Sequence, residues 1–209
     1  MGHIFTLSIL LLSITLSQNT MSAESYDYPE LMVSPRASER IRLEIDREKS
    51  GSFLKNHKAL QLAGLTTLLA GVLQSSNVNL DDDPKENSPK MGMLIGGGWV
   101  IATALLDMKY KPYRKGFDNA KRVKGKSKRD QLTRERLSEE AINNAGKLGR
   151  KLDYLGVATN LLAGSYMMAS VKKDTISQVA NILSIVTAFT PFVFNNYWTK
   201  VSKTQNSYK

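Results

Sequence analysis

Residues 137–171 read LSEEAINNAGKLGRKLDYLGVATNLLAGSYMMASV, and their character changes halfway along. In the first half, apolar residues recur every three to four positions, which is the spacing of an amphipathic helix. From residue 152 onward the apolar residues are nearly continuous, and about 20 of them can cross a bilayer core of about 30 Å. We therefore predict one helix that leads from an amphipathic segment into a membrane span. The repeating residues are Leu137, Ala141, Ala145, Leu148, Leu152 and Leu155.

Three further apolar stretches, residues 60–78, 91–106 and 178–198, are also close to span length. No Asp, Glu, Lys, Arg or His interrupts the middle of any of the four stretches. Each helix of a soluble bundle would carry a charged outer face, and that face is missing. The sequence therefore predicts an all-α fold, a four-helix transmembrane bundle with an amphipathic helix leading into the third span. A soluble or periplasmic helical bundle is the alternative, and the mean hydropathy of -0.28 agrees with it.

These stretches divide the chain into membrane hairpins and polar segments. The divisions are residues 1–23, a signal peptide or an upstream extension; 24–58, a charged N-terminal helical segment; 59–109, the first transmembrane hairpin; 110–151, a basic amphipathic loop; 152–199, the second transmembrane hairpin; and 200–209, a basic tail.

The N-terminal segment has two interpretations. Residues 4–16 form an apolar run of signal-peptide length, and small residues follow around Ser22 and Ala23. No Lys or Arg precedes the run, although an ordinary signal peptide carries one there. Met21 offers the second interpretation, in which translation starts at this residue and the first 20 residues are an extension.

The distribution of positive charge predicts an orientation. If the N-terminal segment, the central loop and the tail lie on one side of the membrane, that side holds all but four of the 29 Lys and Arg. The positive-inside rule places such a side in the cytoplasm. A cleaved signal peptide would instead export it, so the orientation stays open. We expect the protein to lie in a membrane, and we predict that this is the bacterial cytoplasmic (inner) membrane. The four exceptions are Lys85, Lys90, Lys172 and Lys173.

Two polar segments flank the first hairpin. Ser34 and Pro35 predict the start of a charged helix that continues to about Lys49. Its acids and bases balance, so we expect a solvated or surface-lying helix in spite of a narrow stripe made by Ile41 and Ile45.

In the central loop, a basic stretch could contact anionic membrane lipid or a partner, or serve only as a topology signal. Nucleic acid is not favoured, because no nucleic-acid motif accompanies the charges. The basic stretch comprises Lys121, Arg122, Lys124, Lys126, Lys128 and Arg129.

Small residues in the spans indicate close helix packing. Gly92 and Gly96 form a G-x-x-x-G motif in the second span, and such residues let two backbones approach. The close contact could lie within the bundle. It could instead join two copies in a homo-oligomer, or join the chain to an envelope protein partner. Pro191 predicts a kink in the fourth span. The remaining helix-packing candidates are Gly64, Gly71, Gly156 and Gly164.

The residue inventory argues against catalysis and metal binding. The chain has no Cys and two His, so thiol chemistry is excluded and His chemistry would rest on His57. The adjacent carboxylates of residues 81–83 lack the alternating spacing of a calcium loop. Asp107 and Asp153 lie only at span ends, where we expect pairing with Lys109 and Lys151. We predict neither an enzyme nor a cofactor site.

These observations predict an integral membrane protein with a structural or assembly role in a cell envelope. The alternative is a small channel or transporter, which needs a polar stripe across the helices. Asn160, Asn181 and Gln178 are the candidates for that stripe.

Overall fold

The regular elements of the protein are helices throughout the described chain. The computed structural model describes residues 28–49, 56–76, 87–170 and 175–208. The all-α prediction is therefore confirmed for these residues, while the segment of residues 1–23 and the acidic turn of residues 81–83 lie outside them. The elements are α2 (Pro29–Met32), α3 (Ala37–Lys49), α4 (Lys58–Ser75), α5 (Ser88–Lys109), α6 (Pro112–Lys121), α7 (Lys128–Ser170), α8 (Thr175–Ala188), α9 (Thr190–Val193) and α10 (Tyr197–Asn206).

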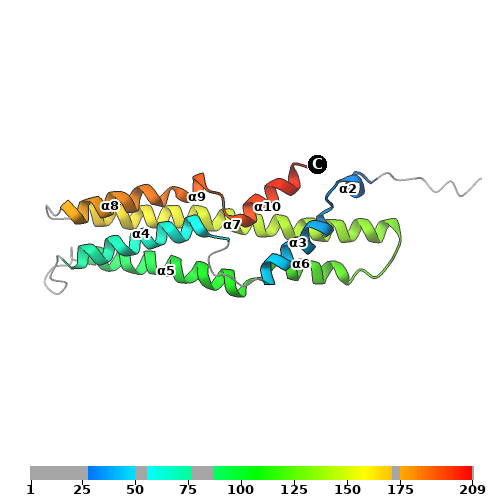
Figure 1. Cartoon of the computed structure of the whole chain (residues 1–209), viewed down its shortest axis with the longest axis horizontal. Coiled ribbons are helices and arrows are strands. Elements are labelled where there is room, and N and C mark those ends of the chain that lie inside the picture. Colours follow the sequence, from blue (N-terminus) through cyan, green and yellow to red (C-terminus); the bar gives the residue numbers. More distant parts are fainter. Residues whose placement is uncertain (1–27, 50–55, 77–86, 171–174, 209) are drawn as a thin grey trace, which may run out of the picture.

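Helix α7 runs along the long axis of the molecule, and helices of both ends pack against it (Figure 1). Its 43 residues reach about 64 Å at 1.5 Å per residue. Helices α4, α5 and α8 pack on its C-terminal half, and α3, α6 and α10 pack on its N-terminal half (Figure 1). The predicted passage from an amphipathic segment into an apolar one is thus a single helix shared by two bundles. We call these the apolar bundle and the polar bundle.

Helix α7 begins earlier than its apolar repeat predicts. At its start, Ser127 Oγ accepts a hydrogen bond from Asp130 N at 3.1 Å, and Asp130 Oδ2 accepts one from Ser127 N at 3.2 Å. This reciprocal arrangement is a capping box, which satisfies backbone groups that the first turn leaves unpaired. The cap starts the helix at Lys128, before the apolar repeat begins.

The polar bundle has an ordinary hydrophobic core. Ile41 and Ile45 of α3 lie in it, at 0 % and 8 % exposure, together with Tyr113, Ile142 and Trp198. The prediction that α3 is a solvated or surface-lying helix was therefore wrong. Most of its charges lie on the outward face, although Glu44 is buried and accepts hydrogen bonds from the Tyr197 hydroxyl, whereas the narrow stripe packs against α6 and α7.

The apolar bundle differs, because its interior mixes polar side chains with apolar ones such as Leu60 and Met167, while its outer surface is largely apolar. Thr67, Asn160 and Asn181 are 0 % exposed, whereas Leu94 and Leu162 are 73 % and 70 % exposed. The buried hydroxyls bond between helices, as in the 3.0 Å contact of the Thr67 and Ser184 hydroxyls. Water does not favour so much exposed apolar surface, but a lipid environment does.

Two segments of the described chain are long and apolar enough to cross a membrane: Ser88–Lys121 and Thr175–Asn206. Core helices of soluble proteins can also meet that criterion, but such helices are mostly buried. Here only 22 % and 28 % of the apolar windows are buried, which favours a lipid-facing role. Helix α4 and the C-terminal half of α7 are not among these segments.

The fourth apolar stretch is interrupted near Pro191. Helix α8 ends at Ala188, and α9 begins at Thr190 with the proline in its first turn. Thr190 Oγ1 donates to Thr187 O at 2.7 Å and to Ala59 O at 3.0 Å. The predicted kink is thus a break, and the threonine beside it ties the broken segment to α4.

Candidate functional site at the junction of the two bundles

Buried polar residues gather where the apolar bundle meets the polar bundle, a level that we call the junction. Asp107, near the end of α5, accepts hydrogen bonds from Asn56 Nδ2 at 2.9 Å and from Asn56 N at 3.3 Å. The Nε2 atom of His57 lies 3.9 Å from Asp107 Oδ1, and neither of these two side chains is exposed. One carboxylate therefore holds the start of α4 against the end of α5.

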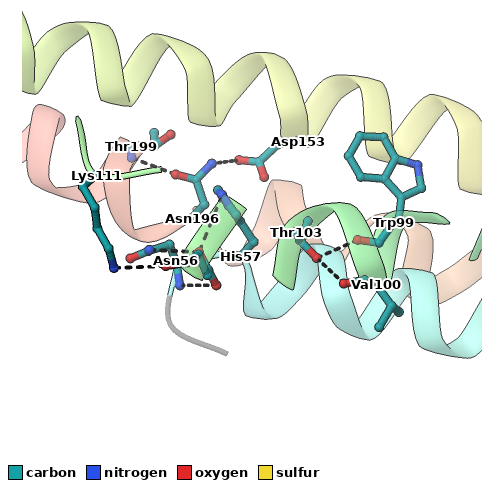
Figure 2. Close-up of polar contacts among 10 residues, drawn as sticks. Asn56, His57, Trp99, Val100, Thr103, Lys111, Asp153, Asn196 and Thr199 are labelled. Atoms are coloured by element: carbon teal, nitrogen blue, oxygen red, sulfur yellow. Dashed lines mark hydrogen bonds and ion pairs between the residues drawn. The ribbon is translucent and has the colours of Figure 1, made fainter. Parts of the chain in front are cut away.

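A second buried carboxylate joins α7 to α10. Asn196 Nδ2 donates to Asp153 Oδ2 at 2.7 Å, while Asn196 Oδ1 accepts from Thr199 N at 2.8 Å (Figure 2). The second bond makes Asn196 the N-cap of α10. Gly149 of α7 allows this approach, because a Cβ at that position would overlap the Asn196 amide.

A third carboxylate, Glu48 at the end of α3, caps α6. Its two oxygens accept hydrogen bonds from Tyr113 N and Arg114 N, each at 3.0 Å. Lys111 Nζ donates to Glu48 O at 2.8 Å and holds the same helix end. Burial raises the pKa of Glu48, and the two backbone hydrogen bonds and the nearby Lys111 oppose that rise.

Aromatic rings pack against the buried polar groups of the junction. Trp198 is 1 % exposed and meets His57 edge-on at 4.7 Å between ring centroids. Burial lowers the pKa of His57, although Asp107 acts in the opposite direction. A cavity of about 10 Å³ remains beside Glu44, Glu48 and Asp107, which is room for about one water molecule. This cavity is too small for an organic substrate.

Sequence reasoning missed the partners of these carboxylates. It predicted lysine partners for Asp107 and Asp153, whereas the contacts shown above are to Asn56, His57 and Asn196. The available signal was the position of Asn56 and Asn196, which lie near the ends of apolar stretches as the two aspartates do.

The six glycines predicted to pack helices all lie at contacts between helices of this chain. A Cβ on Gly64 would lie 2.9 Å from Gly96 O, so these two residues mark the close approach of α4 and α5. This placement accounts for the glycines without a second copy, and an oligomer stays a prediction. The other neighbours are Leu68 for Gly96, Pro89 and Met93 for Gly71, Met167 for Gly92, Leu60 for Gly156, and Ile185 for Gly164.

The basic stretch lies at the far end of the polar bundle, in the connection from α6 to α7 (Figure 1). Arg134 Nη1 donates to Val123 O at 3.0 Å and to Gly125 O at 2.7 Å, which fixes the connection on α7. Helical rise puts Lys128 about 37 Å along α7 from Asp153. The six basic residues are therefore remote from the junction.

No protein-family model, curated protein or solved structure matches the chain. The surfaces of the two bundles and the junction between them are therefore the basis for inferring function.

Proposed function

We propose that the chain is an integral membrane protein with a structural or assembly role in a cell envelope. In this proposal α4, α5, the C-terminal half of α7 and the segment α8–α9 span the membrane as a four-helix bundle. The polar bundle stands on one side and presents a basic end to a partner. A bacterial cytoplasmic membrane stays our prediction for the location.

The reversal of inside and outside along α7 carries this proposal. In its N-terminal half Ile142 is buried and Lys147 is exposed, whereas in its C-terminal half Asn160 is buried and Leu162 is exposed. One continuous helix therefore passes from a surface suited to water to a surface suited to hydrocarbon. The change falls at the junction, near Asp153.

The polar residues of α4 and α7 are compatible with spanning. Gln61 and Gln74 of α4 are 6 % and 3 % exposed, and Asn160 of α7 is 0 % exposed. Their side chains lie inside the bundle and do not face lipid. Mean hydropathy takes no account of the face that a residue occupies. The buried amides therefore lower the mean hydropathy of these two helices relative to the segments that contain α5 and α8. Helix α4, at 18 residues, reaches about 27 Å, close to the hydrocarbon thickness.

The proposed orientation follows from the placement of the basic segments. Helices α3, α6 and α10 all pack on the N-terminal half of α7, so most of the positive charge stands on one side of the apolar bundle. The positive-inside rule makes that side cytoplasmic. The basic stretch would then lie about 37 Å from the membrane surface by helical rise, several times the Debye length of about 8 Å. A protein partner therefore suits the stretch better than lipid of the same membrane.

Labelling of two positions on α7 tests the proposed boundary. We would introduce Lys147→Cys and Leu162→Cys separately, since both side chains are exposed and the chain has no native Cys. A hydrophilic maleimide applied to open membrane fragments should label residue 147 at once and residue 162 only after denaturation. Equal labelling of both positions in undenatured fragments would contradict a lipid-embedded apolar bundle.

A small channel is the second candidate, and the buried amides favour it. Asn160 Oδ1 and both amide atoms of Asn181 have no hydrogen-bond partner among the described residues. Unpaired buried polar atoms are costly, so their presence calls for a reason, and a polar pathway would supply one. Packing in the bundle interior is the alternative reason.

A further inference from the structure

A groove of about 400 Å³ opens at the junction beside the turn between α9 and α10. Its lining comes from the end of α3, the start of α4, the turn itself and the start of α10. Its volume falls within the range of about 300 to 1,000 Å³ that small-molecule sites occupy. The cavity beside Glu48 has about one fortieth of this volume and adjoins the groove, since Arg47, Asn56 and Tyr197 line both.

The groove is positively charged. Arg47, Lys58 and Lys200 line it, and its described lining residues include no carboxylate. The side chains of Lys58 and Lys200 make no hydrogen bond or ion pair with another described residue. The Arg47 guanidinium lies 3.4 Å from the centroid of the Tyr197 ring, which holds this cation in position. Glu44 and Glu48 line the neighbouring cavity together with Arg47, so Lys58 and Lys200 are the cations of the groove that suit an anionic group best.

The groove also has apolar lining residues. Leu62 and Phe194 line it and are 47 % and 66 % exposed. Both residues belong to segments of the apolar bundle, whereas Arg47 and Lys200 belong to the polar bundle. The groove therefore joins a cationic wall to an apolar wall across the junction.

We propose that this groove binds one anionic phospholipid, with the phosphate against Lys58, Lys200 and Arg47 and an acyl chain along Leu62 and Phe194. The inference rests on the proposed function, which puts the junction at the membrane surface. Basic pockets at that level of a membrane protein recognise anionic headgroups. A soluble phosphate would use the cations and leave the apolar wall uncovered, so the groove fits a lipid better.

Retention of defined lipids by the purified full chain tests the proposal. The protein in detergent would be titrated with dioleoylphosphatidylglycerol or dioleoylphosphatidylcholine, and bound lipid would be counted by native mass spectrometry. The wild type should retain one phosphatidylglycerol in clear preference to phosphatidylcholine. The double variant Lys58→Gln/Lys200→Gln should bind phosphatidylglycerol roughly 25-fold more weakly, about fivefold for each cation near an anionic group.

Two further variants make the result specific. Lys126→Gln/Lys128→Gln removes the same charge from the far end of the polar bundle and should leave retention unchanged. Lys58→Arg/Lys200→Arg keeps the charge and should retain the lipid, which separates lost binding from lost folding. Equal retention of both lipids by the wild type, or equal losses in the two Gln variants, would overturn the proposal. Neither result depends on the α7 labelling, so failure of the lipid site is distinguishable from failure of the membrane placement.

Discussion

At the scale of single residues, Asn196 makes two buried hydrogen bonds, one that caps α10 and one to the carboxylate of Asp153. Asn196→Ala should lower the free energy of unfolding by about 2–4 kcal/mol, since it removes a cap and leaves a buried carboxylate without this donor. Thermal unfolding of the purified protein in detergent measures this. Asn195→Ala is the matched control, because Asn195 is exposed, and it should cost less than about 0.5 kcal/mol. Equal losses would contradict the role assigned to Asn196.

His57 gives the junction a dependence on pH. Burial lowers its folded pKa below the ordinary value of 6.5, so the folded protein favours the neutral ring. Its contribution to stability is therefore full above about pH 6.5 and is lost as the pH falls through the lowered value. Between pH 7.5 and pH 5.5, acidification should therefore destabilise the wild type more than His57→Phe, which keeps a ring against Trp198, and the difference between their melting temperatures measures this contribution. A variant with an unchanged pH profile would assign the dependence to other groups.

At the scale of helices, the glycine contacts set the distance between α4 and α5. Gly96→Leu should destabilise the protein by about 3 kcal/mol, the upper part of the usual range for overpacking, because the new side chain meets the backbone of Leu68. Gly98→Leu, two residues along the same helix, is the control, since a Cβ there meets nothing within 4 Å. Size-exclusion chromatography in detergent should show a folded protein for Gly98→Leu and aggregates for Gly96→Leu. Similar profiles for the two variants would contradict this contact.

Sequence periodicity identified the helices better than it identified their ends and partners. The three-to-four spacing from Leu137 predicted the continuity of α7, because periodicity is a local property. The earlier start of α7 depends on the cap made by Ser127 and Asp130, a local signal that was not used. The burial of Ile41 depends on faces of α6 and α7 that are distant in sequence, and no local pattern reports such a contact.

At the scale of the whole molecule, the role of the buried amides separates a scaffold from a channel. The double variant Asn160→Leu/Asn181→Leu removes three buried amide atoms that have no partner among the described residues, Asn160 Oδ1 and both amide atoms of Asn181. It also removes the 2.8 Å hydrogen bond from Asn160 Nδ2 to Gly156 O, so a scaffold should keep its stability within about 1–2 kcal/mol. Thermal unfolding in detergent measures the change, and ion flux into liposomes measures any transport. Wild-type flux that the double variant abolishes would favour the channel over the structural role.

The central claim is that the two ends of the molecule lie on opposite sides of a membrane. Asn87→Cys and Lys126→Cys test it most directly, because both positions are exposed, they lie at opposite ends, and the chain has no native Cys. In intact cells, a membrane-impermeant maleimide should label residue 87 alone, and residue 126 should become reactive only after the membrane is opened. Labelling of both positions in intact cells, or of neither until the cells are opened, would contradict the membrane-spanning bundle.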